Sequence, residues 1–144
     1  MNILHNRYDI EECKVLDLYS GTGNIALELW SRGSRSVHSV ESHPQNVRYI
    51  KAVAAKLNAD VKVHRRDVVK FLKETGDKYD LIFADPPYAT IDHQELINLI
   101  YDLELLLPGG TFVLEHASMT SIQDPRLSEQ RTYGQSIFSF FTFD

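Results

Sequence analysis

Short apolar runs alternate with segments of helical spacing along this chain, and this alternation restricts the possible folds more than any other feature. Residues 14–19 read as a buried strand, and residues 24–32 carry apolar side chains at helical spacing before Gly33, a natural helix stop. Further strands are predicted at 36–41, 79–84 and 111–115, together with a strand marked by Val61 and Val63 that ends before Asp67. Further helices are predicted at 44–57, 68–74 and 93–106, and a closing hairpin at 128–133 and 136–143. Strands that alternate with helices indicate βαβ units and a parallel sheet covered on both faces.

We therefore expect a doubly wound α/β fold, in which a mostly parallel seven-stranded sheet ends in an antiparallel hairpin. The 144 residues are enough for one domain, spanning 1–144, with a hydrophobic core of its own. Right-handed crossovers bring the carboxyl ends of parallel strands to one edge, where ligands bind in such sheets.

Four acidic residues are expected near that edge. Asp17 lies near the end of the first strand, and Glu41, Asp67 and Asp85 lie at or just after the ends of later strands. A shared site explains this grouping better than solubility does. The structural alternatives are a solvated strand end for Glu41 and a helix N-cap for Asp67, and the cap is compatible with a ligand contact.

The turn Asp85-Pro86-Pro87-Tyr88 directly follows the apolar run 81–84. Two prolines lack a backbone N–H and have fixed φ angles, so they end the strand in a stiff corner. An acid and an aromatic ring are thereby held together at the tip of a buried strand. This arrangement favours a site that grips a flat, hydrogen-bonding group such as a nucleobase amino group.

The loop that begins at Gly21 matches the loose dinucleotide pattern G-x-G-x-x-G/A, and Glu41 follows about twenty residues later, as a ribose-binding acid should. A dinucleotide-binding fold is therefore a serious alternative. The charges argue against it, because a pyrophosphate binds a helix N-terminus among neutral glycines, whereas acids surround this loop. Acids suit a cofactor that carries an amine cation and a sulfonium, as S-adenosylmethionine does.

Composition narrows the function classes further. The net charge is −5 and the basic residues are scattered, which argues against a large electrostatic footprint for nucleic acid. Cys13 is the only cysteine, so a disulfide framework is excluded and a reducing cytoplasm is expected. The six histidines are separated in the sequence and lack metal-ligand spacing, so no metal is predicted. No apolar stretch is long enough to span a membrane, and no membrane partner is expected.

The order of these motifs resembles that of the class I amino-methyltransferases. The matching segments are Asp-Leu-Tyr-Ser-Gly-Thr-Gly at 17–23, Val-Glu at 40–41, Asp67, and Asp-Pro-Pro-Tyr at 85–88. The resemblance implies S-adenosylmethionine as the cofactor. The glycine loop and the Asp85 turn together are specific to methylation of amino groups.

The resemblance also implies roles for individual residues. The residues close to the methionine part of the cofactor are then Asp17, which helps to hold the ammonium group, with Tyr19, Ser20, Gly21, Thr22 and Gly23. Glu41 accepts hydrogen bonds from the ribose hydroxyls. Asp67 accepts one from the adenine amino group, and Val68 donates a backbone N–H.

Within this class, the chain is similar along nearly its whole length to the small 16S rRNA guanine-N2 methyltransferases. The matching stretches are 17–33, 36–41, 85–88, 108–110, 115–116 and 131–136. This similarity implies methyl transfer to the N2 amino group of a guanine in small-subunit rRNA or in its assembling ribosomal particle. Asp85 and the Pro86 carbonyl then accept hydrogen bonds from the two N–H groups of this amino group, and Tyr88 stacks on the base.

One departure from that family lies at the amino terminus. Its members carry a basic segment with a hairpin before the first sheet strand, whereas residues 1–6 here begin almost at that strand. We therefore expect the chain to lack that segment and to bind RNA weakly, with cofactor binding unaffected.

Two other functions are compatible with the motifs. One is DNA adenine-N6 methylation, since Asp-Pro-Pro-Tyr also serves there, but 144 residues leave no room for a target-recognition region. The other is a cofactor-binding remnant that supports an assembly without catalysing a reaction.

Overall fold

Strands and helices alternate in the computed structural model, which describes residues 10–87 and 90–142. The strands are β1 (Lys14–Leu18), β2 (Ser36–Glu41), β3 (Val61–Arg65), β4 (Tyr79–Ala84), β5 (Leu106–Ala117), β6 (Leu127–Tyr133) and β7 (Ser136–Thr142). The helices are a short 3-10 helix η1 (Ile10–Glu12), then α2 (Asn24–Ser31), α3 (Pro44–Leu57), α4 (Val68–Glu74) and α5 (His93–Asp102).

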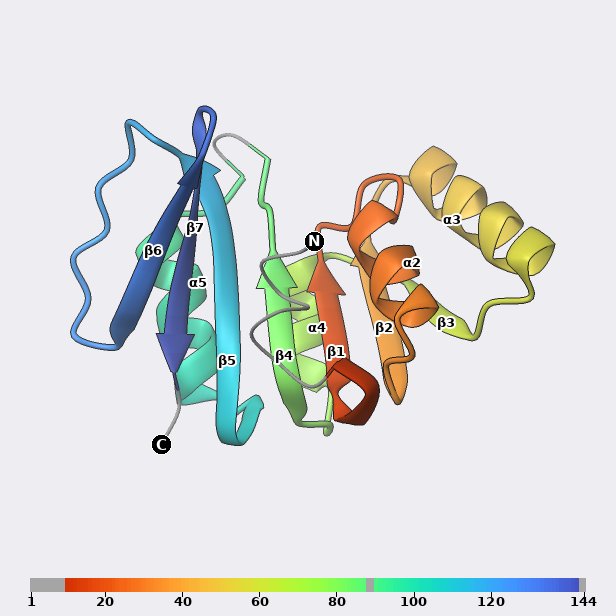
Figure 1. Ribbon diagram of the computed structural model, residues 1–144, viewed down its shortest axis with the longest axis horizontal. Helices are drawn as coiled ribbons and strands as arrows, with labels where there is room; N and C mark the ends of the chain where they lie inside the picture. The colour runs from red at the N-terminus through yellow and green to blue at the C-terminus, as the bar shows by residue number, and fades with distance from the viewer. Residues whose placement is uncertain (1–9, 88–89, 143–144) are drawn as a thin grey trace.

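The strands form one seven-stranded sheet in the order β3-β2-β1-β4-β5-β7-β6 (Figure 1). The pairs formed among β1 to β5 are all parallel, whereas β7 runs antiparallel to both β5 and β6. The predicted fold class, a mostly parallel sheet that ends in an antiparallel hairpin, is confirmed. The carboxyl ends of β1, β4 and β5 lie together at the upper edge in Figure 1.

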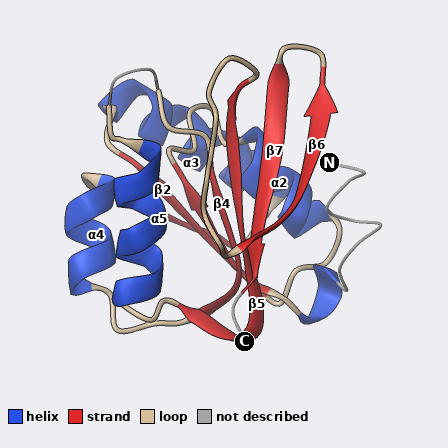
Figure 2. Cartoon of the chain, turned by 90° about the vertical axis from the view of Figure 1, so that its left-hand side faces the viewer, coloured by secondary structure: helices blue, strands red, loops and turns tan. Residues whose placement is uncertain are grey.

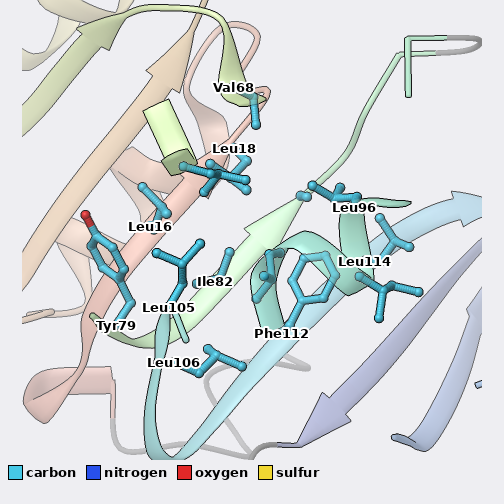
Figure 3. Close-up of a cluster of buried hydrophobic side chains, with 14 of the residues drawn as sticks. Leu16, Leu18, Val68, Tyr79, Ile82, Leu96, Leu105, Leu106, Phe112 and Leu114 are labelled. Carbon is cyan, nitrogen blue, oxygen red and sulfur yellow. The ribbon is translucent and has the colours of Figure 1, made fainter. Parts of the chain in front are cut away.

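The hydrophobic core has two parts, one on each face of the sheet. Figure 2 shows α4 and α5 against one face and α2 against the other. The larger part joins side chains of β1, β4 and β5 to those of α4 and α5, including Leu16, Ile82 and Phe112 (Figure 3). The smaller part packs Leu29 of α2 against Phe83 and its neighbours. This double coverage explains why the parallel strands are apolar on both sides.

The region between α5 and β5 differs from the prediction. The sequence predicts a helix to residue 106 that is stopped by Pro108-Gly109-Gly110, but α5 ends at Asp102 and β5 already begins at Leu106. The cause is pairing with β4, which starts with a hydrogen bond from the Tyr79 N–H to the Leu105 carbonyl and shifts register soon after. Gly110 is needed in this shift, because a Cβ there would lie 2.8 Å from the Leu107 carbonyl oxygen.

None of the helices in the described residues is long and apolar enough to cross a membrane.

Candidate active site

The glycine loop leaves β1 and enters α2 through a series of left-handed backbone conformations. Tyr19, Gly21 and Gly23 have φ angles of 59°, 58° and 82°. Gly23 is the N-cap of α2 without a side-chain cap, and a Cβ on it would lie 2.8 Å from Cγ1 of Ile50 in α3. The loop therefore requires glycine at this position for both its conformation and its packing.

Asp17 is almost completely buried under this loop, with 1% of its surface exposed. Its Oδ2 has no hydrogen-bond partner among the described residues. Burial raises the pKa of Asp17 to about 7, and the negative charges of Asp85 and Glu41 contribute to the increase. A buried acceptor without a partner, on the wall of a cavity, fits the ammonium group of the predicted cofactor.

Glu41 supports the glycine loop from the end of β2. Its Oε1 accepts a hydrogen bond from the Gly21 N–H at 3.0 Å, and its Oε2 accepts from the His43 N–H and the Asn46 side chain at 3.0 and 3.2 Å. Three donors thus hold the carboxylate in place and tie the loop to the start of α3. A bond from Glu41 to ribose hydroxyls stays a prediction.

Ser39 is a residue of this region that the sequence analysis missed. It is fully buried and its hydroxyl donates to the Ser20 hydroxyl at 2.6 Å, while the Ser20 hydroxyl donates to the Asp17 carbonyl at 2.8 Å. The chain of bonds fixes the start of the loop against β2. Only the register Asp17↔Ser39 between β1 and β2 could have indicated it.

Asp67 and Val68 lie at the start of α4, beyond the end of β3. Asp67 is exposed and caps the helix by accepting from the Lys70 N–H at 3.1 Å, as predicted for a structural role. Burial raises the pKa of Tyr19 to about 12, and the negative charge of Asp67 adds to the increase. The adenine contacts of Asp67 and Val68 stay predictions.

A cavity of about 330 Å³, here called the loop cavity, opens over the glycine loop. Its lining residues are Asp17, Tyr19, Ser20, Gly21, Thr22, Asn24, Ile25, Phe83, Asp85 and Glu115. Most of the residues predicted to hold the methionine part are therefore brought together.

A second cavity of about 350 Å³, here called the hairpin cavity, lies between the Asp85 turn and the end of the β6–β7 hairpin. Its lining residues are Asp85, Pro86, His93, Glu115, His116, Ala117, Thr120, Gln135 and Ser136. Asp85 and Glu115 line both cavities, so the two spaces meet at this pair of carboxylates. Tyr88 lies outside the described residues, and its stacking role stays a prediction.

The two acids at the junction, Asp85 and Glu115, have raised pKa values. Asp85 is exposed at the edge of the sheet, yet partial burial of its carboxylate raises its pKa. Burial also raises the pKa of the half-buried Glu115, and the charge of Asp85 adds to that increase. Glu115 was noted in the sequence as part of a matching stretch without a role. The signal that identifies it is its position beside Asp85 on the neighbouring strand, which the sequence does not contain.

His116 is held as a neutral side chain beside the hairpin cavity. Its Nδ1 lies 3.1 Å from the Ala117 carbonyl, and its Nε2 lies 2.7 Å from the Ser139 hydroxyl, which also accepts from the Gln130 side chain. Nδ1–H therefore donates, and Nε2 accepts from Ser139. Burial lowers the pKa of His116, so this ring does not offer a positive charge to a ligand.

Histidines that are separate in the sequence meet in the fold. His38 and His64 approach to 2.9 Å between Nδ1 and Nε2, and the rings of His93 and His116 lie 5.7 Å apart. Packing therefore brings together histidine side chains that are separated in the sequence. Across the described part of the chain, no group of three or more His, Cys, Asp or Glu residues is suited to hold a metal ion.

Several known proteins are similar to this chain. The ribosomal RNA small subunit methyltransferase D of Buchnera aphidicola subsp. Baizongia pistaciae is 32% identical over 92 residues, which cover 63% of this chain and 47% of that protein. The protein of the same name from Buchnera aphidicola subsp. Acyrthosiphon pisum is 28% identical over 119 residues, covering 81% of this chain and 62% of that one. The chain thus spans less than two thirds of the length of either curated relative.

A solved structure of a hypothetical protein from Thermus thermophilus superposes with a TM-score of 0.86 at 29% identity, covering 97% of this chain and 80% of that chain. The names of the curated relatives agree with the predicted methyltransferase class. The family described as Conserved hypothetical protein 95 matches residues 1–142, which is nearly the whole sequence. The resemblance to the small rRNA methyltransferases is therefore confirmed at the level of the family, and this chain belongs to the Conserved hypothetical protein 95 family.

Proposed function

We propose that this protein uses S-adenosylmethionine to methylate the N2 amino group of a guanine in small-subunit rRNA, free or in an assembling ribosomal particle. The observation that carries the proposal is the meeting of the loop cavity and the hairpin cavity at Asp85. One cavity suits a methyl donor and the other suits a base, and a carboxylate stands between them. Because the proposed substrate is ribosomal, we expect the reaction to take place in the cytoplasm.

The loop cavity suits the cofactor by charge. The unpartnered Oδ2 of Asp17 offers an acceptor to the ammonium group, and the positive φ of Gly21 and Gly23 lets the backbone come close to the ligand. Glu41 and Ser39 hold the loop in this shape before a ligand arrives. Such preorganisation reduces the ordering that binding requires.

The Asp85 turn suits an amino group as the methyl acceptor. A guanine amino nitrogen is a poor nucleophile because its lone pair is delocalised into the ring. Asp85 and the Pro86 carbonyl each accept a hydrogen bond from one N–H group of the amino nitrogen. These bonds draw the nitrogen toward tetrahedral geometry, which frees its lone pair for attack on the methyl group. The base must be unpaired or flipped out of a helix to enter the hairpin cavity.

The bond changes balance as an in-line displacement. S-adenosylmethionine supplies a methyl group bonded to a positively charged sulfur, which keeps the bonding electron pair when the methyl leaves. The amino nitrogen uses its lone pair for the new N–C bond and becomes positively charged. The carboxylate of Asp85 stabilises this developing charge and, with a raised pKa, is a suitable acceptor for the proton that the nitrogen then loses.

A tritiated-methyl transfer assay tests the proposal. Small subunits that lack their native methylation and protein-free 16S rRNA are each incubated with the enzyme and labelled S-adenosylmethionine, and the RNA is then digested to nucleosides. Label in N2-methylguanosine supports the proposal. Label in N6-methyladenosine, or no transfer to either substrate by a chain that binds S-adenosylhomocysteine in a calorimeter, contradicts it.

A further inference from the structure

The carboxylates of Asp85 and Glu115 lie at the ends of two neighbouring strands, where the two cavities meet. In the parallel pair of β4 and β5, Ala84 lies opposite Leu114, so Asp85 and Glu115 are the next residues of the two strands. Neighbouring strands are about 4.8 Å apart, so side chains from the two strands can reach adjacent hydrogen-bonding groups on the edge of one base. Both residues line the loop cavity and the hairpin cavity.

Glu115 is also oriented from the opposite side. The hydroxyl of Ser136, at the start of β7, forms a hydrogen bond with its carboxylate, which limits the increase in pKa that burial and Asp85 produce. Ser136 lines the hairpin cavity as well. A half-buried acid that is held in place on a cavity wall, next to an acid with an assigned role, lacks a role of its own in the chemistry described above.

The loop cavity supplies independent evidence that a ligand belongs beside this pair. Asp17 lines the same cavity as Asp85 and Glu115, is 1% exposed, and leaves its Oδ2 without a partner among the described residues. A cationic donor bound there would fix which side of the two carboxylates is open to a second ligand. That side is the hairpin cavity.

We propose that Glu115 is a specificity-determining residue that accepts the N1–H of the target guanine while Asp85 holds the neighbouring N2 amino group. This inference rests on the proposed function. Guanine carries N1–H and N2–H₂ as adjacent donors on one edge, and two adjacent carboxylates are the complementary pair of acceptors.

The same pair of acceptors rejects other bases. Adenine places an amino group beside the N1 lone pair, so Glu115 would face an acceptor and lose its solvation without a compensating hydrogen bond. A site built for a donor discriminates strongly against an analogue that lacks it, because the buried polar group is left unpaired. The pair of carboxylates therefore selects guanine over adenine at the binding step, before any methyl transfer takes place.

A substrate analogue and a variant of Glu115 together test this contact. Once nucleoside mapping has identified the methylated guanine, a synthetic rRNA fragment is prepared with either guanine or 2-aminopurine at that position. 2-Aminopurine keeps the 2-amino group but has a lone pair at N1 instead of a proton, and it also lacks the 6-oxo group, so a variant of Glu115 is compared as well. We expect wild-type enzyme to favour the guanine RNA in kcat/KM by about tenfold or more, the effect of one unpaired polar group.

The variant Glu115→Gln provides the second comparison, because its amide can turn and donate to an N1 lone pair. We expect the preference for guanine to fall by about tenfold or more relative to wild type, while affinity for S-adenosylhomocysteine stays within about twofold. Glu12→Gln, an equal loss of charge on the exposed η1 at the opposite end of β1, should keep the wild-type preference.

The outcomes separate this inference from the function on which it rests. If nucleoside mapping of RNA treated with wild-type enzyme finds no N2-methylguanosine, the proposed function fails. If it methylates guanine and 2-aminopurine RNA equally well, the role of Glu115 is wrong whether or not the variant folds. If Glu115→Gln is folded, active and as selective as wild type, the role is also wrong, although guanine methylation stands.

Discussion

Asp17 shows at the scale of one residue how binding and stability can oppose each other. Its carboxyl group is 1% exposed, and burial raises its pKa from 3.8 to about 7. The charged form is therefore disfavoured in the folded protein, yet the charged form is the one that would bind an ammonium group. A residue that serves the cofactor in this way weakens the ligand-free fold.

We predict that Asp17→Asn stabilises the ligand-free protein at pH 8. Because the folded pKa lies above the unfolded value, the stability linked to Asp17 is complete below about pH 4 and is lost as the pH rises to about 7. Each pKa unit corresponds to about 1.4 kcal/mol, so removal of the charge should raise the free energy of unfolding by about 2–4 kcal/mol. Urea denaturation at pH 8 and pH 5 measures the difference.

The gain from Asp17→Asn should shrink as the pH is lowered toward 5, where the wild-type carboxyl is protonated. The exposed Asp60→Asn serves as the control and should change stability by no more than about 0.5 kcal/mol. In parallel, calorimetry should find weaker binding of S-adenosylhomocysteine to Asp17→Asn. A stability gain of equal size at both pH values would contradict the assigned protonation.

Asp85→Ala is expected to separate catalysis from folding. The residue is exposed at the end of β4, and in the proposed function it acts on charge that develops during transfer, so its loss should leave the fold intact within about 0.5 kcal/mol. Methyl transfer should fall by at least about a hundredfold, as for other removed electrostatic contacts. Single-turnover transfer and calorimetry with S-adenosylhomocysteine measure the two properties, and near-wild-type turnover would show that the turn has another role.

At the scale of elements, the start of α2 is where the glycine loop is fixed to the rest of the fold. Gly23 begins the helix in a left-handed conformation and lies against Ile50 of α3. Glu41, at the end of β2, ties Gly21 to the start of α3. The loop therefore depends on the relative position of two helices and not on its own sequence alone.

We predict that Gly23→Ala destabilises the protein by about 2–3 kcal/mol, the sum of left-handed strain and the contact that a Cβ would make with Ile50. Cofactor affinity should fall as well, because Ile50 and the loop must move apart. Gly134→Ala is the matched control, since it has a φ of 60° with open space around it in the β6–β7 turn. It should cost only the strain, about 1 kcal/mol, with cofactor affinity unchanged.

The edge of the sheet at β2 and β3 carries a pair of histidines that makes stability depend on pH. His38 and His64 share a hydrogen bond of 2.9 Å, and burial lowers the pKa of both below 6.5. The positive charge of Lys62 acts in the same direction on both rings, whereas Asp77 opposes it. For His38 Lys14 adds to the decrease, and for His64 Arg66 does so.

We predict that this pair makes the protein less stable as the pH falls below about 6.5. A lowered folded pKa means that the stability of the neutral pair is complete above the unfolded pKa and is lost below it. His38→Gln should flatten the stability profile between about pH 6.5 and 5, as measured by urea denaturation. The exposed His43→Gln should keep the wild-type slope, and an identical slope for His38→Gln would assign the pH dependence to other groups.

At the scale of the whole molecule, the sequence predicts the layers well and the contacts across them poorly. Periodicity and glycine positions predicted β2, α3 and α4 with the bounds that the structure has, because those signals are local. The start of β5 was missed, because the segment after α5 pairs with β4 instead of continuing the helix. The local sequence between Asp102 and Leu106 contains no glycine or proline that would have predicted the end of the helix.

The candidate site divides in the same way. The glycine loop and the Asp85 turn were predicted, because each is a continuous motif with its own chemistry. Glu115 and Ser39 were missed, because their importance comes from lying opposite residues of another strand. A single sequence shows which residues alternate in and out of a strand, but it does not show the register between strands.

The position of the β6–β7 hairpin after β5 in the sequence also sets an order of events during synthesis. The lining of the loop cavity lies between Asp17 and Glu115, whereas the hairpin cavity needs Gln135 and Ser136 as well. Because a chain is synthesised from its amino terminus, the lining of the loop cavity is made before the lining of the hairpin cavity is complete. A nascent chain can therefore contain every residue that lines the loop cavity before it contains Gln135 and Ser136 of the hairpin cavity.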